Sequence, residues 1–166
     1  MNLTNASKRG WLALLLVPLA LALPAQHAQA QSFTTLQTWP AGSFATGWTS
    51  IVDTPNGLFY YNAQNGSAAV GRVTSTGNHV TVRTYPAFSF ATGWSSIVST
   101  PNGIFFYNAQ TGAGAIGTID SAGNHTTLLT YPNGAFALGW SRLTYSPNGI
   151  LFYNGSTGAG ATGRVN

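Results

Sequence analysis

Three tryptophans are the side chains of this sequence best suited to binding chemistry, because Trp48, Trp94 and Trp140 recur with a spacing of 46 residues. An indole ring offers an apolar face on which a sugar ring can stack, and its N–H group can donate a hydrogen bond to a ligand. The same pattern is typical of a core residue that begins each unit of a repeat. The sequence leaves both interpretations open.

Polar side chains repeat with the same spacing. Asn62, Asn108 and Asn154 each follow a tyrosine; an amide there can bond ligand hydroxyls in both directions, or it can hydrogen-bond the adjoining turn. His79 and His125 each follow Gly-Asn, where a histidine either contacts a ligand or lies in a solvated turn. The predicted ligand-binding residues are therefore Trp48, Trp94, Trp140, Asn62, Asn108, Asn154, His79 and His125.

The sequence offers little for catalysis. Asp53 and Asp120 occupy different positions in their repeats, so they do not form a repeated acid/base pair. Cysteine is absent, and two histidines without neighbouring carboxylates make a poor set of metal ligands. The GxGxxG pattern that begins at Gly112 continues into a strand and a turn, whereas dinucleotide binding requires a helix and a later carboxylate. We therefore predict that the protein is not an enzyme and has no catalytic residue, metal site or cofactor.

These residues belong to a 46-residue unit that occurs three times without an inserted or deleted residue. Its other landmark is a Pro-Asn-Gly turn, at residues 55–57, 101–103 and 147–149. A period of this length indicates an array of supersecondary units, none of which buries its apolar face alone. A site built on the unit would be present several times, which favours multivalent binding over a single catalytic centre.

Each unit contains four short strand patterns separated by turn signals. In the middle unit the strands are expected at residues 95–99, 104–109, 115–120 and 125–131, as a four-stranded antiparallel meander. The second of these strands is continuously apolar from Ile104 to Tyr107, which is typical of a strand covered on both faces. Sheets stacked face to face around an axis, as the blades of a β-propeller are, provide such burial.

The segment from Gly139 to Tyr153 combines a Gly-Trp opening, a Ser-Pro-Asn-Gly turn and an aromatic strand. In this it resembles the repeat of tachylectin-2-like β-propeller lectins, and the resemblance covers nearly all of residues 33–166. It implies an all-β fold of three tandem four-stranded units, each a propeller blade, and a carbohydrate-binding function. The chain departs from the family pattern in having three units and a Gly-Ala-Gly sequence in the third strand. A β-trefoil-like threefold barrel is the alternative for three units of this length.

A single repeat domain is expected at residues 31–166, with units at about 39–84, 85–130 and 131–166. An N-terminal strand at 33–38 corresponds to the fourth strand of a unit, which the last unit lacks. A strand so placed can complete the last blade and remove the unpaired edges of the array. Since propellers have about four to eight blades, three units suggest a homo-oligomer in which a dimer forms six blades.

Residues 1–30 are predicted to be a secretory signal peptide, because Lys8 and Arg9 precede an apolar run and Ala28 and Ala30 form the small-residue pattern of a cleavage site. The protein is therefore expected to be secreted or periplasmic. The rest of the chain contains four dispersed arginines, which do not form a nucleic-acid-binding patch. Its strands are too short to cross a bilayer, which takes about 9–11 residues per strand. No nucleic-acid partner and no membrane insertion are predicted.

The leading hypothesis is a secreted, non-enzymatic, lectin-like protein that binds glycans or glycosylated surfaces through repeated weak sites. Several sites held at fixed spacing bind a glycan-coated surface more tightly than one site does, through effective concentration. The alternative is an extracellular protein-interaction or scaffold propeller with no sugar site.

Overall fold

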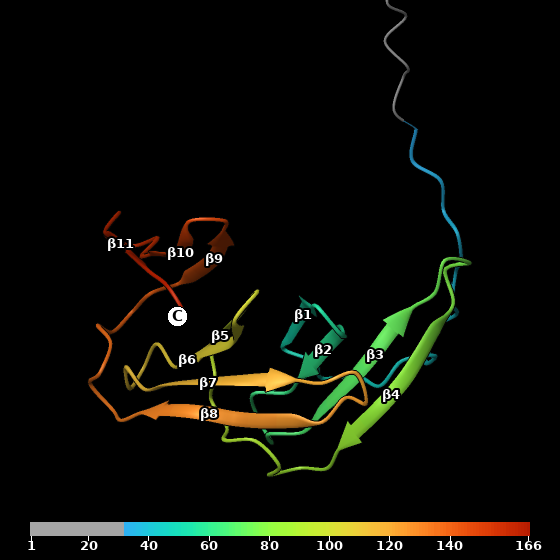
Figure 1. The fold of residues 1–166 in the computed structure, drawn as a ribbon, viewed down its shortest axis with the longest axis horizontal. Helices are drawn as coiled ribbons and strands as arrows, with labels where there is room; N and C mark the ends of the chain where they lie inside the picture. The colour runs from blue at the N-terminus through green and yellow to red at the C-terminus, as the bar shows by residue number, and fades with distance from the viewer. Residues whose placement is uncertain (1–31) are drawn as a thin grey trace, which may run out of the picture. The chain divides into compact units, whose positions relative to one another are not determined.

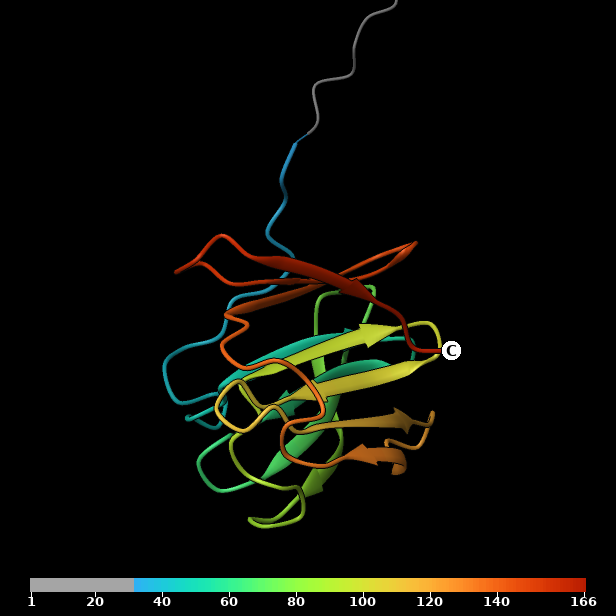
Figure 2. The same cartoon turned by 90° about the vertical axis from the view of Figure 1, so that its left-hand side faces the viewer.

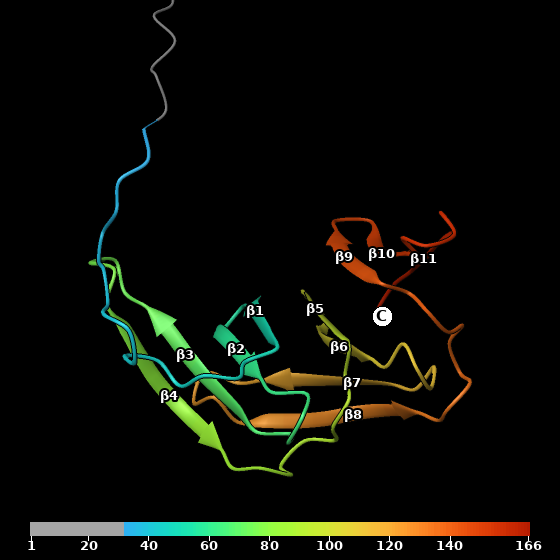
Figure 3. The ribbon, with the colours of Figure 1, turned by 180° about the vertical axis from the view of Figure 1, so that it is seen from behind.

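A computed structural model describes residues 32–166 of the protein, and the predicted signal peptide at residues 1–30 lies outside them. The chain divides after Thr34, and the unit from Thr35 to Asn166 contains all the strands described here. The described residues form eleven β-strands and no helix, which confirms the all-β prediction. The strands make three separate antiparallel sheets (Figures 1 and 3), which favours the meander-unit prediction over the threefold barrel.

Each repeat unit folds into one sheet whose strands pair in chain order. The first sheet comprises β1 (Ser50–Thr54), β2 (Gly57–Tyr61), β3 (Ala68–Val73) and β4 (His79–Tyr85). The second comprises β5 (Ser96–Thr100), β6 (Gly103–Tyr107), β7 (Gly114–Ile119) and β8 (His125–Tyr131). The third comprises β9 (Arg142–Ser146), β10 (Gly149–Tyr153) and β11 (Gly160–Gly163). The predicted four-stranded meander is confirmed for the first two units.

The Pro-Asn-Gly turns close the first hairpin of each sheet. Thr54 pairs with Gly57 at the end of the first ladder, and its hydroxyl donates a hydrogen bond to the Gly57 carbonyl oxygen at 2.6 Å. Gly57 has a φ of +129°, a conformation that favours glycine. Thr100 and Gly103 repeat this arrangement in the second sheet, with a donor–acceptor distance of 3.0 Å. The turn chemistry read from the sequence therefore sets where β1 and β2 end and begin.

The predicted N-terminal strand at residues 33–38 is not formed in the single chain. Residues 32–40 have no strand assignment, and none of the eleven strands pairs with them. A β-strand exists only as part of a hydrogen-bonded ladder. The prediction required β11 as the neighbour of this segment, and in the structure β11 pairs only with β10.

Apolar side chains of neighbouring sheets pack face to face. The first strands of the three sheets follow one another, because β1 contacts β5 and β5 contacts β9 (Figures 1 and 2). One buried cluster joins the first and second sheets, where the rings of Phe59 and Phe106 lie 5.9 Å apart between centroids. A second cluster joins the second and third sheets, where Phe105 and Phe152 are also 5.9 Å apart. Adjacent residues of β6 thus pack on opposite sides, which confirms its predicted double burial.

A buried tyrosine hydroxyl links each sheet to the segment that leads into the next. Tyr61, at the end of β2, donates to the carbonyl oxygen of Ala91 at 2.7 Å and accepts from the N–H of Trp94 at 3.4 Å. Tyr107 makes the same two bonds one unit later, with the same distances. Burial raises the pKa of both phenols, so the hydroxyls remain protonated donors.

Candidate functional site

The three predicted tryptophans occupy equivalent positions, just before the first strand of each sheet, and all three are partly buried. Each ring packs against an aromatic ring from the second strand of its own sheet. The pairs and their centroid distances are Trp48–Tyr60 at 5.8 Å, Trp94–Phe106 at 5.9 Å and Trp140–Phe152 at 6.1 Å. The tryptophans therefore support the sheets, and each keeps only part of its surface exposed.

The predicted asparagines hold the turn between the second and third strands. The Oδ1 atom of Asn62 accepts hydrogen bonds from the backbone N–H groups of Gln64 at 2.9 Å and Asn65 at 3.4 Å. Its Nδ2 atom lies beside Gly47, 2.9 Å from where a β-carbon on that glycine would be. Asn108 and Asn154 cap their turns in the same way. The geometry matches the turn-capping alternative, and it leaves these amides little freedom to turn towards a ligand.

The two predicted histidines are packed against the sheets, because a shift in register makes room for them. His79 and His125 begin β4 and β8 and lie over Gly71 and Gly117, where the ladder to the third strand shifts by one residue. A β-carbon on either glycine would overlap the imidazole Nε2 atom. The ring of His125 lies 4.7 Å from that of Phe90. Both Nε2 atoms are buried and have no hydrogen-bond partner among the described residues.

The buried imidazole of His125 makes the stability of the fold depend on pH. Burial lowers the pKa of His125 below its ordinary value. The unfolded chain therefore binds this proton at a higher pH than the folded chain, and stability falls as the pH drops below about 6.5. Asp120 titrates below this window, because hydrogen bonds from Asn124 lower the pKa of its carboxyl group.

We expect the urea midpoint of unfolding to be unchanged between about pH 7 and pH 9 and to decrease between about pH 6.5 and pH 5. A His125→Phe variant keeps an aromatic ring over Gly117 and removes the titrating group, so the decrease should be smaller. A wild-type midpoint that does not change across this window would contradict the assignment of a buried, neutral imidazole.

A polar pocket that the sequence analysis did not identify lies at each junction, between the Pro-Asn-Gly turns of adjacent sheets. Its volume is 320 Å³ between the first and second sheets and 300 Å³ between the second and third. The two pockets occupy equivalent positions, and most of their lining residues correspond one unit apart. In the second pocket Arg164 and Asn166 take the places of Thr118 and Asp120. The polar side chains that line the first are Thr54, Asn56, Thr100, Asn102, Thr118 and Asp120.

Two asparagines of the turns fix the shape of these pockets. The Nδ2 atom of Asn56 donates across the first junction to the Ile119 carbonyl oxygen at 2.7 Å, and that of Asn102 donates across the second to Val165 at 2.9 Å. Within residues 32–166, the Oδ1 atoms of Asn56 and Asn102 make no hydrogen bond to the protein. A fixed amide carbonyl oxygen can accept a hydrogen bond from a hydroxyl group of a polyol. The repeated Thr/Ser-Pro-Asn-Gly motif was the sequence signal for this site, although it indicated only a hairpin.

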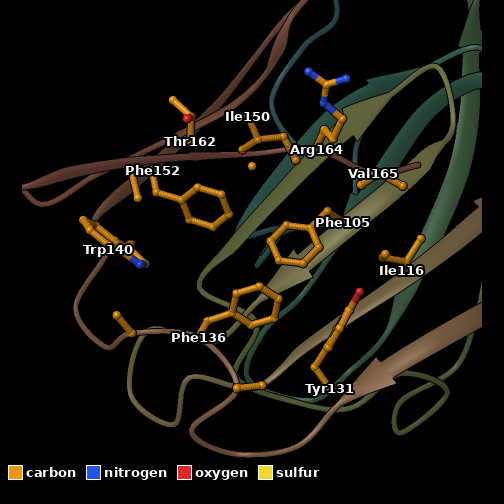
Figure 4. Close-up of a pocket in the computed structure, with 14 residues that line it drawn as sticks. Phe105, Ile116, Tyr131, Phe136, Trp140, Ile150, Phe152, Thr162, Arg164 and Val165 are labelled. Carbon is orange, nitrogen blue, oxygen red and sulfur yellow. The ribbon is translucent and has the colours of Figure 1, made fainter.

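A more apolar cavity of 310 Å³ lies between the second and third sheets (Figure 4). Phe105, Phe136, Trp140 and Phe152 form much of its wall. One unit earlier, Phe90 and Phe106, which correspond to Phe136 and Phe152, pack against the ring of His125, which the fourth strand of the second sheet supplies. No fourth strand lies beside β11 in the part of the chain that the structure describes, so no equivalent ring fills this space.

Residues 32–166 contain no cluster of three or more histidine, cysteine, aspartate or glutamate side chains that could hold a metal ion. The same residues include no helix of the length and apolarity needed to span a membrane. Comparison of the chain with models of known protein families, with curated proteins and with solved structures gave no match. The candidate site therefore rests on its own geometry.

Proposed function

We propose that the protein is a secreted, non-enzymatic, lectin-like carbohydrate-binding protein whose sheets are blades of a β-propeller. The observation that carries the proposal is the pair of equivalent polar pockets at successive junctions, with volumes of 320 and 300 Å³. Four-stranded meanders that stack with their first strands adjacent support the propeller arrangement. Under this proposal each junction carries one binding site.

The chemistry of the junction pockets suits a neutral polyol. Their walls offer hydroxyl and amide groups, and the rings of Pro55 and Pro101 add apolar surface. The carboxylate of Asp120 already accepts hydrogen bonds from the backbone N–H groups of Ala122 at 2.9 Å and Asn124 at 2.8 Å. Among residues 32–166, Arg164 is the one cationic side chain that lines either pocket, so a polyanion would find few partners there. Each such site binds a glycan weakly. Several sites at a fixed spacing bind a glycan-coated surface with a much higher overall affinity.

The partly exposed tryptophans form a second contact surface in this proposal, at the opposite end of the first strand of each sheet. Each indole is held in place by its aromatic neighbour, so little conformational entropy would be lost on stacking against a sugar ring. The junction pockets supply hydrogen bonds, and the indoles supply apolar surface.

Binding of the purified protein to a glycan array and to polysaccharide resins tests the proposal. We expect retention on at least one neutral glycan, and a loss of about tenfold or more in Asn102→Ala, because Asn102 lines both pockets and multivalent binding amplifies the loss of a site. The matched control is Asn78→Ala, an exposed asparagine of the β3–β4 turn whose side chain bonds only the nearby Thr76 hydroxyl. This control should bind as the wild type does.

Failure to bind any glycan or polysaccharide would contradict the carbohydrate function. Unchanged binding in Asn102→Ala together with loss in Trp94→Phe would instead place the site at the tryptophans. Since the Asn102 side chain also links two sheets, unfolding midpoints and circular dichroism must show that each variant is folded.

Phe88 favours a second candidate function, a protein-interaction scaffold. Its side chain is 82% exposed, and its φ of +65° is occupied by glycine in the other two units, at Gly42 and Gly134. An exposed aromatic residue in a strained conformation is a feature of contact sites. Capture of a protein partner that survives deglycosylation and excess free sugar, and that is lost in Phe88→Gly, would support this function.

A further inference from the structure

Two sheet faces remain uncovered, and one of them is the outer face of the third sheet. Leu151 and Tyr153 on β10 are 44% and 42% exposed. The residues at the same positions in the other sheets, Phe59 and Tyr61 in the first and Phe105 and Tyr107 in the second, are all buried against a neighbouring sheet. The outer face of the third sheet therefore carries the contact residues of a junction without the sheet that they would contact.

The second uncovered face belongs to the first sheet, and it corresponds to the face of the second sheet that packs against the first sheet. Ile51 and Val73 are 59% and 54% exposed. Their counterparts in the second sheet, Ile97 and Ile119, are buried in the cluster that joins it to the first. The two open faces are thus the same two faces that already meet at both junctions within the chain.

The segment just before the first sheet lies where the fourth strand of a preceding sheet would lie. The ring of Trp39 packs edge-on against Phe44 at 5.4 Å, as Tyr85 does against Phe90 at 5.2 Å in the next unit. Leu36 and Gln37 are the side chains that a β-carbon on Gly77 would meet. One unit later, a β-carbon on Gly123 would likewise meet the side chains of Val82 and Arg83 of β4, which correspond to Leu36 and Gln37. Residues 36–39 therefore lie where a fourth strand would lie, but they have no backbone hydrogen bonds to a neighbouring strand in the single chain.

We propose that a second copy of this chain supplies the missing strand, so that two copies close each other into a ring. Residues 35–39 of each copy add to β11 of the other, in the register that β8 keeps with β7. The outer face of each third sheet then covers the first sheet of the other copy. Two copies make six sheets, within the range of about four to eight blades that propellers have, whereas three copies would make nine.

The proposed junction also repeats the hydrogen bonds of the internal ones. Tyr153, whose hydroxyl makes no bond within residues 32–166, corresponds to Tyr61 and Tyr107. In the ring it donates to the partner copy's Ala45, which corresponds to Ala91. Asn148 likewise donates to the partner copy's Val73, as Asn56 does to Ile119 within the chain.

The same register explains the apolar cavity of Figure 4. It pairs Val165, which lines that cavity, with the partner copy's Phe33, just as Ile119 pairs with His125 in the second sheet. An aromatic ring at this position lies over Gly163, where a β-carbon would meet nothing nearer than a Phe152 ring atom at 3.5 Å. The cavity of 310 Å³ is then the space for the ring of the added strand.

Three measurements test this assembly, and the first is the mass of the purified protein in solution. We expect twice the mass of one chain. A single-chain mass at micromolar concentration, or a series of higher multiples without a closed dimer, would overturn the proposal.

The second measurement uses disulfide trapping, because the sequence contains no cysteine. The register places Thr38 of one copy opposite Ala161 of the other, so Thr38→Cys with Ala161→Cys should give a dimer band on a non-reducing denaturing gel. Gln37→Cys with Ala161→Cys is the control, since a shift of one residue puts the two side chains on opposite faces. A cross-link confined to single chains, or equal cross-linking of both pairs, would overturn the register.

The third measurement is the mass of Gly158→Ala. A β-carbon on Gly66 would overlap the Phe90 carbonyl oxygen, and one on Gly112 would overlap that of Phe136, whereas Gly158 has nothing within 4 Å. In the ring, Gly158 faces the partner copy's Phe44. Gly158→Ala should therefore convert the dimer into monomers that keep the wild-type circular dichroism spectrum. A dimer that persists in this variant would contradict the proposed junction.

Discussion

A Gly112→Ala variant is expected to lose about 3–5 kcal/mol of unfolding free energy, because strain at a positive φ and overlap in a packed junction add together. Gly112 has a φ of +68°, and a β-carbon there would overlap the carbonyl oxygen of Phe136. The backbone cannot easily move away, since the Phe136 N–H donates to the Gly112 carbonyl oxygen at 2.9 Å. The β6–β7 turn therefore packs against the segment that leads into the third sheet with no room for a methyl group between them.

Gly134→Ala is the matched control for this variant. Gly134 has a φ of +81°, and a β-carbon there has nothing within 4 Å. It should lose only the cost of the left-handed conformation, about 1–2 kcal/mol. Urea denaturation at neutral pH measures both losses. Equal losses in the two variants would show that the junction yields to the added methyl group and is not closely packed.

A Phe106→Ala variant is expected to lose about 3–5 kcal/mol of unfolding free energy, because it leaves a cavity where several aromatic rings meet. Phe106 is buried, and its ring contacts those of Phe59, Trp94 and His125, each at 5.9 Å between centroids. Since domains of this size are stable by about 5–15 kcal/mol, the variant should lose a large part of its stability.

Phe88→Ala serves as the control for Phe106→Ala, because it makes the same chemical change at an exposed side chain. Its unfolding free energy should stay within about 0.5 kcal/mol of the wild type. Urea midpoints report both changes. A small loss in Phe106→Ala would mean that the first and second sheets depend little on each other.

The strands were predictable from the sequence, because the signals that define them are local. Asn-Gly after proline fixes a tight turn wherever it occurs, so β5 and β6 begin and end within two residues of their predicted positions. The continuous apolar sequence of β6 also indicated correctly that both its faces are covered. The N-terminal strand at residues 33–38 stays a prediction, because a strand needs a paired neighbour and none of the described strands pairs with this segment in the single chain.

The candidate site was less predictable, because it forms between units. The turn residues Asn56 and Asn102 line one pocket only after two sheets have stacked, which no single unit reveals. The histidines were harder still. Gly-Asn before His125 resembles a solvated turn, but the shift in register at Gly117 opens a space over the glycine, and the imidazole fills it. Bulges of this kind depend on pairing between strands and leave no distinct mark in the sequence.

The junctions between the sheets consist mainly of aromatic rings that pack edge-on and of hydrogen bonds between uncharged groups, with Arg72, which donates to the Ser121 carbonyl oxygen, as a charged exception at the first junction. Screening by salt weakens interactions between charges, and few of these contacts involve a charge. Screening should therefore change the stability of the fold only slightly. It remains sensitive to cold, since apolar contacts weaken on cooling as the heat-capacity change of unfolding takes effect. A fall in temperature should therefore weaken the contacts between the sheets more than a change in ionic strength does.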